Sequence, residues 1–298
     1  MIYRKGQRLL VQGITGKQGG FWAEKMAAMG TPLVGGVNPK RASETFLGLP
    51  VFATARDAMA VAPFDIAVMF IPPNAAKAAA LDAIEAGAKG LVILTEHIPQ
   101  HDVLVIRDAG KTFGTQIIGP NTAGLVTPGA GFVGIMPGHN PNIFQPGRIG
   151  VISRSGSLGT LTCLNLTRAG LGQSAFIGIG GDPMIGTTTL GALQALDEDA
   201  ATDAVVMVGE IGGAMEEEAA DYAAGMTKPV VAFIAGRVSP PGKKMGHAGA
   251  IVTGMAGSYH GKREALERAG VGVADTPSQI PVMMATALER KRTAVDEA

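Results

Sequence analysis

The sequence predicts an α/β protein with two doubly wound parallel sheets in tandem. Short apolar runs of strand length alternate with alanine-rich stretches of helical spacing along most of the 298 residues. Repeated βα units of this kind form parallel sheets, because a right-handed crossover helix returns each strand beside an earlier one. A Gly/Pro/Asn-rich passage at residues 119–147 interrupts the rhythm, and this predicts a linker or crossover between two domains.

Each element follows from its own run of residues. Before the interruption we expect strands at residues 9–12, 33–37, 66–71, 90–94 and 116–118, and helices at 22–29 and 75–86. After it we expect strands at 149–152, 174–179, 204–208 and 230–234, and helices near 156–169, 188–197, 216–224 and 262–269.

Composition excludes several classes of protein. The 25 basic and 25 acidic side chains cancel, so no basic field attracts nucleic acid or an anionic membrane. No apolar run of about 18 residues and no signal peptide is present, and we therefore expect a cytoplasmic protein. Cys163 is the only cysteine, expected as a small core residue of a helix, and no Cys/His spacing predicts a metal site.

The loop at residues 13–20 is a glycine-rich turn between the first predicted strand and a helix. Its backbone N–H groups and the helix dipole are suited to holding a pyrophosphate. The glycine spacing differs from the dinucleotide fingerprint, and the next strand leads into Lys40 and Arg41 rather than into an acidic residue. Basic residues there favour a ribose phosphate over a free 2′-hydroxyl. The alternative is a tight turn that binds nothing.

A second loop, at residues 153–159, again joins a strand to a helix. Ser155 and Ser157 offer hydroxyl and N–H groups at the helix start, which is a general anion cradle. Serine is also the ordinary structural choice for a helix N-cap, so this motif alone does not decide between the two interpretations.

A carboxylate and a histidine follow two later strands. Glu210 ends a buried strand between glycines, and His247 lies in a loop of glycine and alanine at residues 242–250, where Lys243 and Lys244 would draw an anion toward the imidazole. A carboxylate bonded to one ring nitrogen fixes the tautomer and leaves the other nitrogen free as a nucleophile. We therefore predict a Glu210–His247 couple, the alternatives being a Glu210–lysine pair and a histidine in an ordinary turn.

Nine motifs follow one another along the chain, at residues 13–20, 35–37, 48–52, 95–96, 119–121, 153–156, 178–183, 209–213 and 246–250. Together and in this order they closely resemble the alpha subunit of succinyl-CoA synthetase and its relatives among the NDP-forming acyl-CoA ligases. The resemblance implies a Rossmann-like CoA-binding domain at residues 1–124, a linker or crossover at 125–147, and a flavodoxin-like ligase domain at 148–298.

The resemblance also implies partners and cofactors. Coenzyme A binds to this chain, whereas ATP or GTP with Mg²⁺ binds to a separate ATP-grasp beta subunit. The two subunits assemble as one αβ heterodimer or as a heterotetramer of two such pairs. A nucleoside triphosphate phosphorylates a histidine, the phosphoryl group passes to a carboxylate, and the CoA thiol displaces phosphate from the acyl phosphate.

Residue by residue, the resemblance makes His247 the phosphohistidine and Glu210 the carboxylate that orients it. The helix that begins after Ser155 stabilises the phosphorylated histidine, with phosphate contacts expected at Ser153, Ser155, Gly156 and Ser157. The positions that match CoA contacts are Thr15, Gly16, Lys17, Gln18, Lys40, Arg41, Leu94, Thr95, Glu96 and Asn121.

Three departures from the family pattern concern the substrate. Thr160 stands where succinate-activating members carry a tyrosine, Thr122 and Ala123 replace a Cys-Pro pair, and His97 replaces a glycine. These changes favour a substituted or sulfonated short carboxylate over succinate. Two alternatives stay open: an ordinary succinyl-CoA synthetase alpha subunit, and a non-catalytic CoA-sensing module, which the retention of His247 and Glu210 disfavours.

Overall fold

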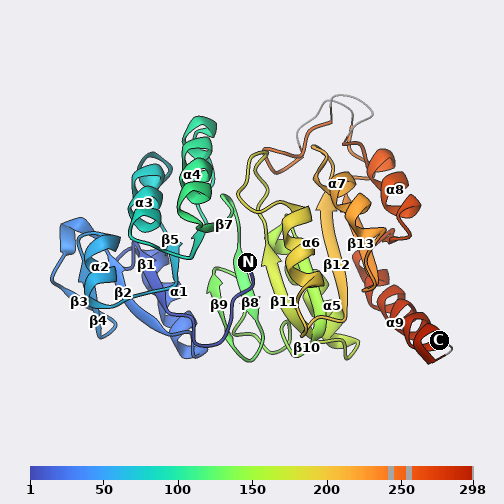
Figure 1. Cartoon of the computed structure of the whole chain (residues 1–298), viewed down its shortest axis with the longest axis horizontal. Helices are drawn as coiled ribbons and strands as arrows, with labels where there is room; N and C mark the ends of the chain where they lie inside the picture. The colour runs from blue at the N-terminus through green and yellow to red at the C-terminus, as the bar shows by residue number, and fades with distance from the viewer. Residues whose placement is uncertain (241–244, 253–256, 297–298) are drawn as a thin grey trace. The chain divides into compact units, whose positions relative to one another are not determined.

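The computed structural model describes residues 1–240, 245–252 and 257–296. Lys243 and Lys244, the predicted attractors of an anion, lie outside these residues. The chain forms two compact units (Figure 1). Apart from the first two residues, the first unit comprises Tyr3–His139 with Met184–Thr187, and the second comprises Asn140–Pro183 with Thr188–Ala298.

The first unit contains a seven-stranded sheet in the order β3-β4-β2-β1-β5-β6-β7, parallel except for the antiparallel β3–β4 pair. From β4 onward this is the strand order of the Rossmann fold, whose switch point lies between β1 and β5. The strands are β1 (Leu9–Gln12), β2 (Leu33–Val37), β3 (Thr45–Phe46), β4 (Leu49–Phe52), β5 (Ile66–Met69), β6 (Gly90–Ile93) and β7 (Gln116–Ile118).

Helices cover this sheet because its strands are apolar throughout. All four residues of β1 are buried, as are those of β5 and β6, which is the pattern of strands enclosed on both faces. Helix α3 packs against α2 on one side and α4 on the other, while α1 contacts β1 and β2. The helices are α1 (Lys17–Ala28), α2 (Ala55–Val61), α3 (Pro73–Glu85) and α4 (Gln100–Phe113), with the short 3-10 helix η1 at Pro39–Arg41.

An antiparallel hairpin follows, formed by β8 (Gly124–Thr127) and β9 (Gly131–Gly134). The helix–strand alternation did not predict these strands, which lie within the passage expected to be a linker. Glycine is required here: a Cβ on Gly124 would lie 1.9 Å from the Val133 carbonyl oxygen. The hairpin is tied to the first unit by Thr31, whose hydroxyl donates to the Phe132 carbonyl oxygen.

The parallel part of the second sheet has the order β14-β13-β12-β10-β11, the flavodoxin-like order with its switch point between β10 and β12. Its strands are β10 (Pro146–Ser153), β11 (Gln173–Gly178), β12 (Ala204–Glu210), β13 (Val230–Ala235) and β14 (Gly272–Ala274). Its helices are α5 (Gly156–Arg168), α6 (Thr189–Asp197), α7 (Met215–Ala223), α8 (Tyr259–Arg268) and α9 (Ile280–Asp296), with η2 at Pro277–Gln279.

The second unit has the layers of a doubly wound fold (Figure 1). Helix α7 packs between α6 and α8, whereas α5 packs against α9. Cys163 is buried in α5, as predicted for a core residue, and burial raises the pKa of its thiol.

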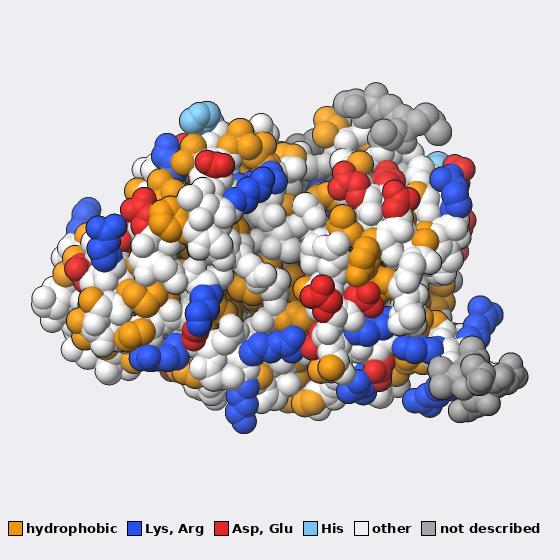
Figure 2. Space-filling view, in the orientation of Figure 1, with side chains coloured by type: hydrophobic (Ala, Val, Ile, Leu, Met, Phe, Trp, Pro, Cys, Tyr) orange, Lys and Arg blue, Asp and Glu red, His pale blue; other side chains and the backbone are white. Residues whose placement is uncertain are grey.

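The surface and the helices agree with the composition. On the face shown in Figure 2, both basic and acidic side chains occur on each unit, in keeping with the equal numbers of the two in the sequence. None of the helices in the described part of the chain has the length and low polarity needed to cross a bilayer.

Candidate active site

The second unit gathers the predicted chemistry at the switch point of its sheet. Strands β10 and β12 are parallel neighbours, so Ser153 and Glu210 reach the same edge of the sheet at their carboxyl ends. Ligands bind at this edge in doubly wound folds, because the two crossover helices diverge there and leave a crevice.

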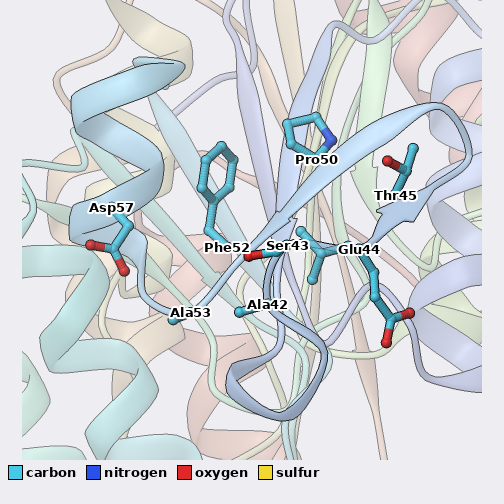
Figure 3. A pocket seen from close by; sticks show the side chains of 9 residues that line it. Ala42, Ser43, Glu44, Thr45, Pro50, Phe52, Ala53 and Asp57 are labelled. Carbon is cyan, nitrogen blue, oxygen red and sulfur yellow. The ribbon is translucent and has the colours of Figure 1, made fainter.

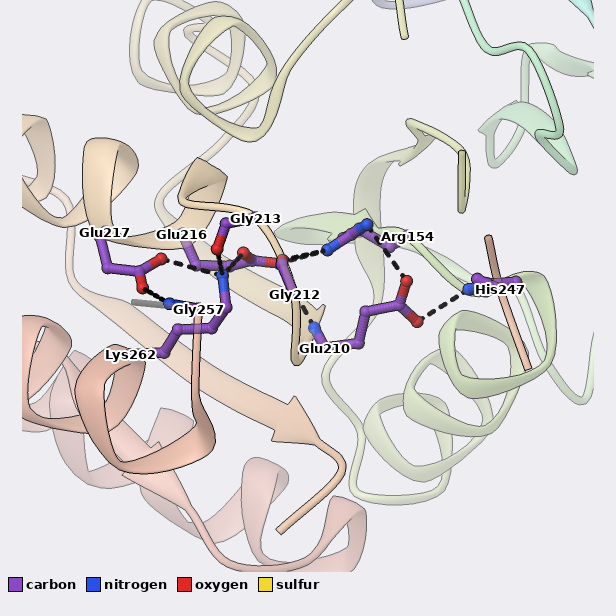
Figure 4. A network of polar contacts seen from close by, with 9 residues as sticks. All are labelled: Arg154, Glu210, Gly212, Gly213, Glu216, Glu217, His247, Gly257 and Lys262. Carbon is purple, nitrogen blue, oxygen red and sulfur yellow. Dashed lines mark hydrogen bonds and ion pairs between the residues drawn. The ribbon is translucent and has the colours of Figure 1, made fainter. Parts of the chain in front are cut away.

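The structure brings His247 and Glu210 together (Figure 4). His247 Nδ1 lies 2.7 Å from Glu210 Oε2, although the residues are 37 positions apart. An ionised carboxylate only accepts hydrogen bonds, so Nδ1 donates and carries the proton of the neutral ring. This tautomer leaves Nε2 with a free lone pair, as a nucleophile requires.

Glycines let the backbone close around this couple. A Cβ on Gly181, in the loop after β11, would lie 2.3 Å from His247 Cγ. A Cβ on Gly249 would lie 2.7 Å from an Arg154 terminal nitrogen, and Gly249 N–H donates to the Gly181 carbonyl oxygen. The glycine content of these loops is therefore a packing requirement, because an alanine side chain would displace the imidazole or the guanidinium.

The pKa of His247 is raised above its ordinary value. The hydrogen bond to Glu210 is the largest cause, because it stabilises the imidazolium, and partial burial opposes it. Among nearby charges, Asp182 raises this pKa further and Arg154 lowers it. The imidazole is 29% exposed, so the ring keeps one side open to a reactant.

Sequence reasoning missed three buried charges beside the couple. Arg154, Glu216 and Lys262 have side chains no more than 2% exposed, and they continue from Glu210 as a line of alternating charge (Figure 4). Arg154 directly precedes Ser155 in the loop considered as an anion cradle, whereas Glu216 and Lys262 lie in helices that look solvated. Their separation along the chain is the reason that no local pattern reveals the cluster.

The serine loop forms a standard helix start. Ser155 is the N-cap of α5, and its hydroxyl accepts from Leu158 N–H at 3.3 Å and lies 3.2 Å from the Ser157 hydroxyl. Ser153 is buried, and its hydroxyl donates to the Ser155 carbonyl oxygen at 2.6 Å. Gly156 is the first residue of the helix, so its N–H lies at the helix N-terminus, where the helix dipole stabilises anions.

Thr160 lies one turn into α5, where its hydroxyl donates to the Gly156 carbonyl oxygen at 2.8 Å. Threonine hydroxyls commonly bond back to the preceding turn of a helix, and here the bond fixes the rotamer. The side chain is partly exposed and much shorter than the phenol of a tyrosine.

The glycine-rich loop of the first unit follows β1 at the Rossmann switch point. Gly16 is the N-cap of α1 and makes no side-chain cap, so the first N–H groups of α1 face outward. Thr15 accepts from the Asn38 amide at 2.6 Å, and Gln18 accepts from the Trp22 indole at 3.2 Å. Lys17 is exposed at the first turn of the helix.

The basic pair after β2 is exposed. Arg41 makes an ion pair with Glu44 at 2.6 Å, and Lys40 donates its backbone N–H to the Asn38 side chain. The residues that follow this pair line a surface hollow of about 380 Å³, between the β3–β4 hairpin and the start of α2 (Figure 3). Its lining includes Glu44, the partner of Arg41.

The loops after β6 and β7 meet. Asn121 N–H donates to the Thr95 carbonyl oxygen at 2.9 Å, and Thr95 donates its hydroxyl to the Ile71 carbonyl oxygen at 2.6 Å. Leu94 is partly buried and Glu96 is exposed, 3.6 Å from His97. Farther along, Thr122 is buried and its hydroxyl accepts from Gly124 N–H, and the Ala123 carbonyl oxygen accepts from the backbone N–H groups of Ile135 and Met136, just after β9.

No metal ligands converge in the described residues, where no group of three His, Cys, Asp or Glu side chains is placed to hold an ion. His101 and His260 are exposed. His139 packs beside the rings of Trp22 and Phe132.

Comparison with known proteins first defines the class. A model of the CoA binding domain matches residues 4–97, and a model of the CoA-ligase family matches residues 152–272. The first match includes the loop before α1, and the second includes both Glu210 and His247.

Full-length relatives define the family. The alpha subunit of the ADP-forming succinate–CoA ligase of Methanothermobacter thermautotrophicus is 48% identical over 273 residues, covering 92% of each chain. The SauD subunit of the ADP-forming sulfoacetate-CoA ligase of Bilophila wadsworthia is 41% identical, covering 95% of this chain and 98% of that one. The chain belongs to the succinate–CoA ligase alpha-subunit family, and it is a CoA-binding subunit of an acid–CoA ligase.

Solved structures show the same fold. The ATP citrate lyase of Methanosaeta concilii, in complex with (3S)-citryl-CoA, superposes with a TM-score of 0.86 at 23% identity. The match covers 95% of this chain but spans only 51% of that longer one. The Rossmann-like and flavodoxin-like halves predicted from the sequence are confirmed at the level of fold.

Proposed function

We propose that His247 carries a phosphoryl group between a nucleoside triphosphate and a carboxylate, within an ADP-forming acid–CoA ligase. The observation that supports this most strongly is the 2.7 Å contact between His247 Nδ1 and Glu210 Oε2 at the switch point of the second sheet. The contact leaves Nε2 as the attacking atom, and the loop exposes the ring to a reactant.

Glu210 has two tasks in this proposal. It holds the proton on Nδ1 while Nε2 attacks the terminal phosphorus and the nucleoside diphosphate leaves. It then balances the positive charge that the ring acquires as a phosphohistidine. In the second step a carboxylate oxygen of the substrate attacks phosphorus, Nε2 leaves, and an acyl phosphate forms.

The start of α5 supplies the complementary site for the phosphoryl oxygens. The N–H groups near Gly156 and Ser157, together with the helix dipole, stabilise negative charge without a change of protonation. Ser155 fixes the helix start through its N-cap bond, and buried Ser153 holds the Ser155 carbonyl in place.

The loop of α1 fits coenzyme A. Its N-cap lacks a side-chain bond, and Gly16 has little space for a side chain, since a Cβ would lie 3.2 Å from the Gly13 carbonyl oxygen. We assign the phosphates of CoA to this helix start, with Lys17, Lys40 and Arg41 as the nearby cations. Thr15 and Gln18 complete the loop, and Leu94, Thr95, Glu96 and Asn121 provide the remaining contacts. The bound CoA supplies the thiol that takes the acyl group and releases phosphate.

The substrate we propose is a substituted or sulfonated short carboxylate. Thr160 leaves room where a tyrosine would extend, and Thr122 and Ala123 alter the neighbouring segment of the family pattern. Relatives that act on sulfoacetate, at 41% and 40% identity, support this assignment. Succinate is the second candidate, supported by the 48% identical relative that acts on it.

The relatives are named as alpha subunits, and we infer a beta partner for this chain. We further propose that the partner has an ATP-grasp fold and binds the nucleotide with Mg²⁺, as one αβ pair or two. This division of labour places the nucleotide site outside the present chain.

The test is to co-express the chain with its beta subunit, and to measure CoA-thioester formation with succinate, malate, itaconate, glutarate and sulfoacetate. We expect turnover of a substituted or sulfonated acid and little turnover of succinate. Efficient turnover of succinate would instead assign the second candidate. Thioester formation without a phosphorylated alpha chain would overturn the role of His247.

A further inference from the structure

Behind the Glu210–His247 couple, the second unit buries the charged side chains of Arg154, Glu216 and Lys262. The side chains of Glu216 and Lys262 are fully buried, and those of Arg154 and Glu210 are 2% and 8% exposed. Ionised groups are almost never buried in this way unless they are paired, because leaving water costs several kcal/mol for each ion. The arrangement of these charges therefore requires an explanation.

The contacts form a line with alternating sign (Figure 4). Lys262 Nζ donates to Glu216 Oε2, to Glu217 Oε2 at 2.9 Å, and to the Gly213 carbonyl oxygen at 2.9 Å. Glu216 Oε1 lies 3.6 Å from an Arg154 nitrogen and accepts from the Glu210 backbone N–H at 3.3 Å. The Lys262–Glu216 pair thus contacts both Arg154 and the backbone that carries Glu210.

Arg154 completes the line at the catalytic end. One terminal nitrogen donates to the Gly212 carbonyl oxygen at 3.2 Å, and the other lies 3.3 Å from Glu210 Oε1. That oxygen is buried and accepts no hydrogen bond from the described residues, so the guanidinium charge is its compensation there. The two oxygens of Glu210 therefore have different neighbours, Arg154 on one side and His247 on the other.

We propose that Arg154 is a positioning residue for the phosphohistidine, held in place by the buried Glu216–Lys262 pair. The guanidinium stabilises Glu210 as a carboxylate and fixes its plane, so that Oε2 is aimed at His247 Nδ1. Without this charge the buried oxygen is uncompensated, and Glu210 rotates away from His247. The rotation removes the acceptor that keeps the ring proton on Nδ1.

This inference rests on the proposed role of His247, but one of its readouts does not. The full chain, with ¹⁵N-labelled histidine, is examined by NMR above the pKa of His247, where the neutral tautomers are distinguished. The His247→Ala spectrum assigns the signal. We expect Nδ1–H in the wild type and in Arg154→Lys, and a mixture of tautomers in Arg154→Met.

The second readout is phosphoenzyme formation in the complex with the beta subunit. Arg154→Met is expected to lower its rate by roughly ten- to a hundredfold, as loss of partners behind functional histidines does, with partial recovery in Arg154→Lys. Arg148→Met is the matched control, because Arg148 lies on the same strand, β10, and pairs with Asp203 on the surface. It should leave both readouts unchanged.

A folded Arg154→Met with the wild-type tautomer and rate would overturn the proposal. If circular dichroism shows that this variant does not fold, the double variant Glu216→Gln/Lys262→Met decides, since it removes the anchor without changing net charge. A wild-type tautomer in that variant also overturns the proposal. Failure of the wild-type complex to become phosphorylated would overturn the proposed function instead, while the tautomer still tests Arg154.

Discussion

The two switch points of this protein, which we propose bind anions, are built in different ways. The loop of the first unit presents backbone N–H groups at the start of α1, with Thr15, Lys17 and Gln18 at or near its surface. The second unit adds a reactive side chain to a similar helix start and supports it with buried charges. In the proposed function the first loop holds coenzyme A, whereas the second orients the atom that forms a bond to phosphorus.

The difference predicts unequal tolerance to substitution. Backbone donors survive most side-chain changes, because the helix supplies them regardless of sequence. A nucleophile requires a specified tautomer and position, which depend on the side chains around it. Substitutions in the two loops therefore provide a graded comparison, from complete loss of phosphorylation to a small change in CoA affinity.

The largest effect is expected for His247→Ala. Removing Nε2 removes the phosphoryl acceptor, so the complex with the beta subunit should incorporate no label from γ-³²P-ATP above background. His260→Ala is the control, since His260 is exposed on α8 and should label as the wild type does. Persistent labelling of His247→Ala would place the acceptor elsewhere.

Glu210→Gln is expected to slow labelling by about two orders of magnitude, within the range for a positioned proton acceptor. The amide loses the negative charge that balances a phosphorylated ring. Rapid-quench measurement of the labelling rate tests this, with the exposed Glu218→Gln on α7 as the control. A rate within threefold of the wild type would contradict the role of Glu210.

Gly181→Ala tests the packing around the ring without removing any polar group. The new Cβ would lie 2.3 Å from His247 Cγ, so the imidazole must move. We expect labelling to fall by roughly tenfold or more, because a displacement of this size spoils the reactive geometry. Gly225→Ala, whose Cβ has no neighbour closer than 3.6 Å, should have the wild-type rate.

Lys17→Ala should have a smaller effect, confined to CoA. The exposed ammonium contributes about 1 kcal/mol or less to an ion pair, which predicts a rise in the KM for CoA of less than about tenfold. Phosphorylation of His247 should be unchanged. Steady-state kinetics separate the two steps, and an effect on labelling would show that the loops are not independent. Lys5→Ala is an exposed control in the same unit.

The smallest expected effect is a displacement along the pH axis. Since Glu210 raises the pKa of His247, labelling should decline as the pH falls through that raised value, and Glu210→Gln should move the decline to lower pH.

The free energy of unfolding should depend on pH in the opposite direction. A raised pKa stabilises the fold fully below the unfolded value of about 6.5, and this contribution is lost as pH rises through the folded value. Urea denaturation of wild type and His247→Ala on both sides of that interval measures it.

Much of the fold could be predicted because its signals are local. The observed bounds of β1, β2 and β7 coincide with the predicted runs, since a buried parallel strand is a short apolar segment. Helices α2, α4 and α9 and the β8–β9 hairpin were not predicted. The hairpin strands are rich in glycine, a residue typical of turns, and their pairing depends on Gly124, which faces Gly134 and has no room for a Cβ beside the Val133 carbonyl oxygen.

The sequence by itself determined the two α/β halves and the glycine-rich loops, and it predicted the pairing of His247 with Glu210, because each lies at a recognisable place after a strand. Only the tertiary structure decided that Arg154, Glu216 and Lys262 are buried behind them. In sequence, Glu216 belongs to an acidic first turn and Lys262 to a charged helix, both typical of solvated surfaces. Their burial depends on contacts between residues 46 to 62 positions apart, and no local pattern records the charge that a distant segment brings.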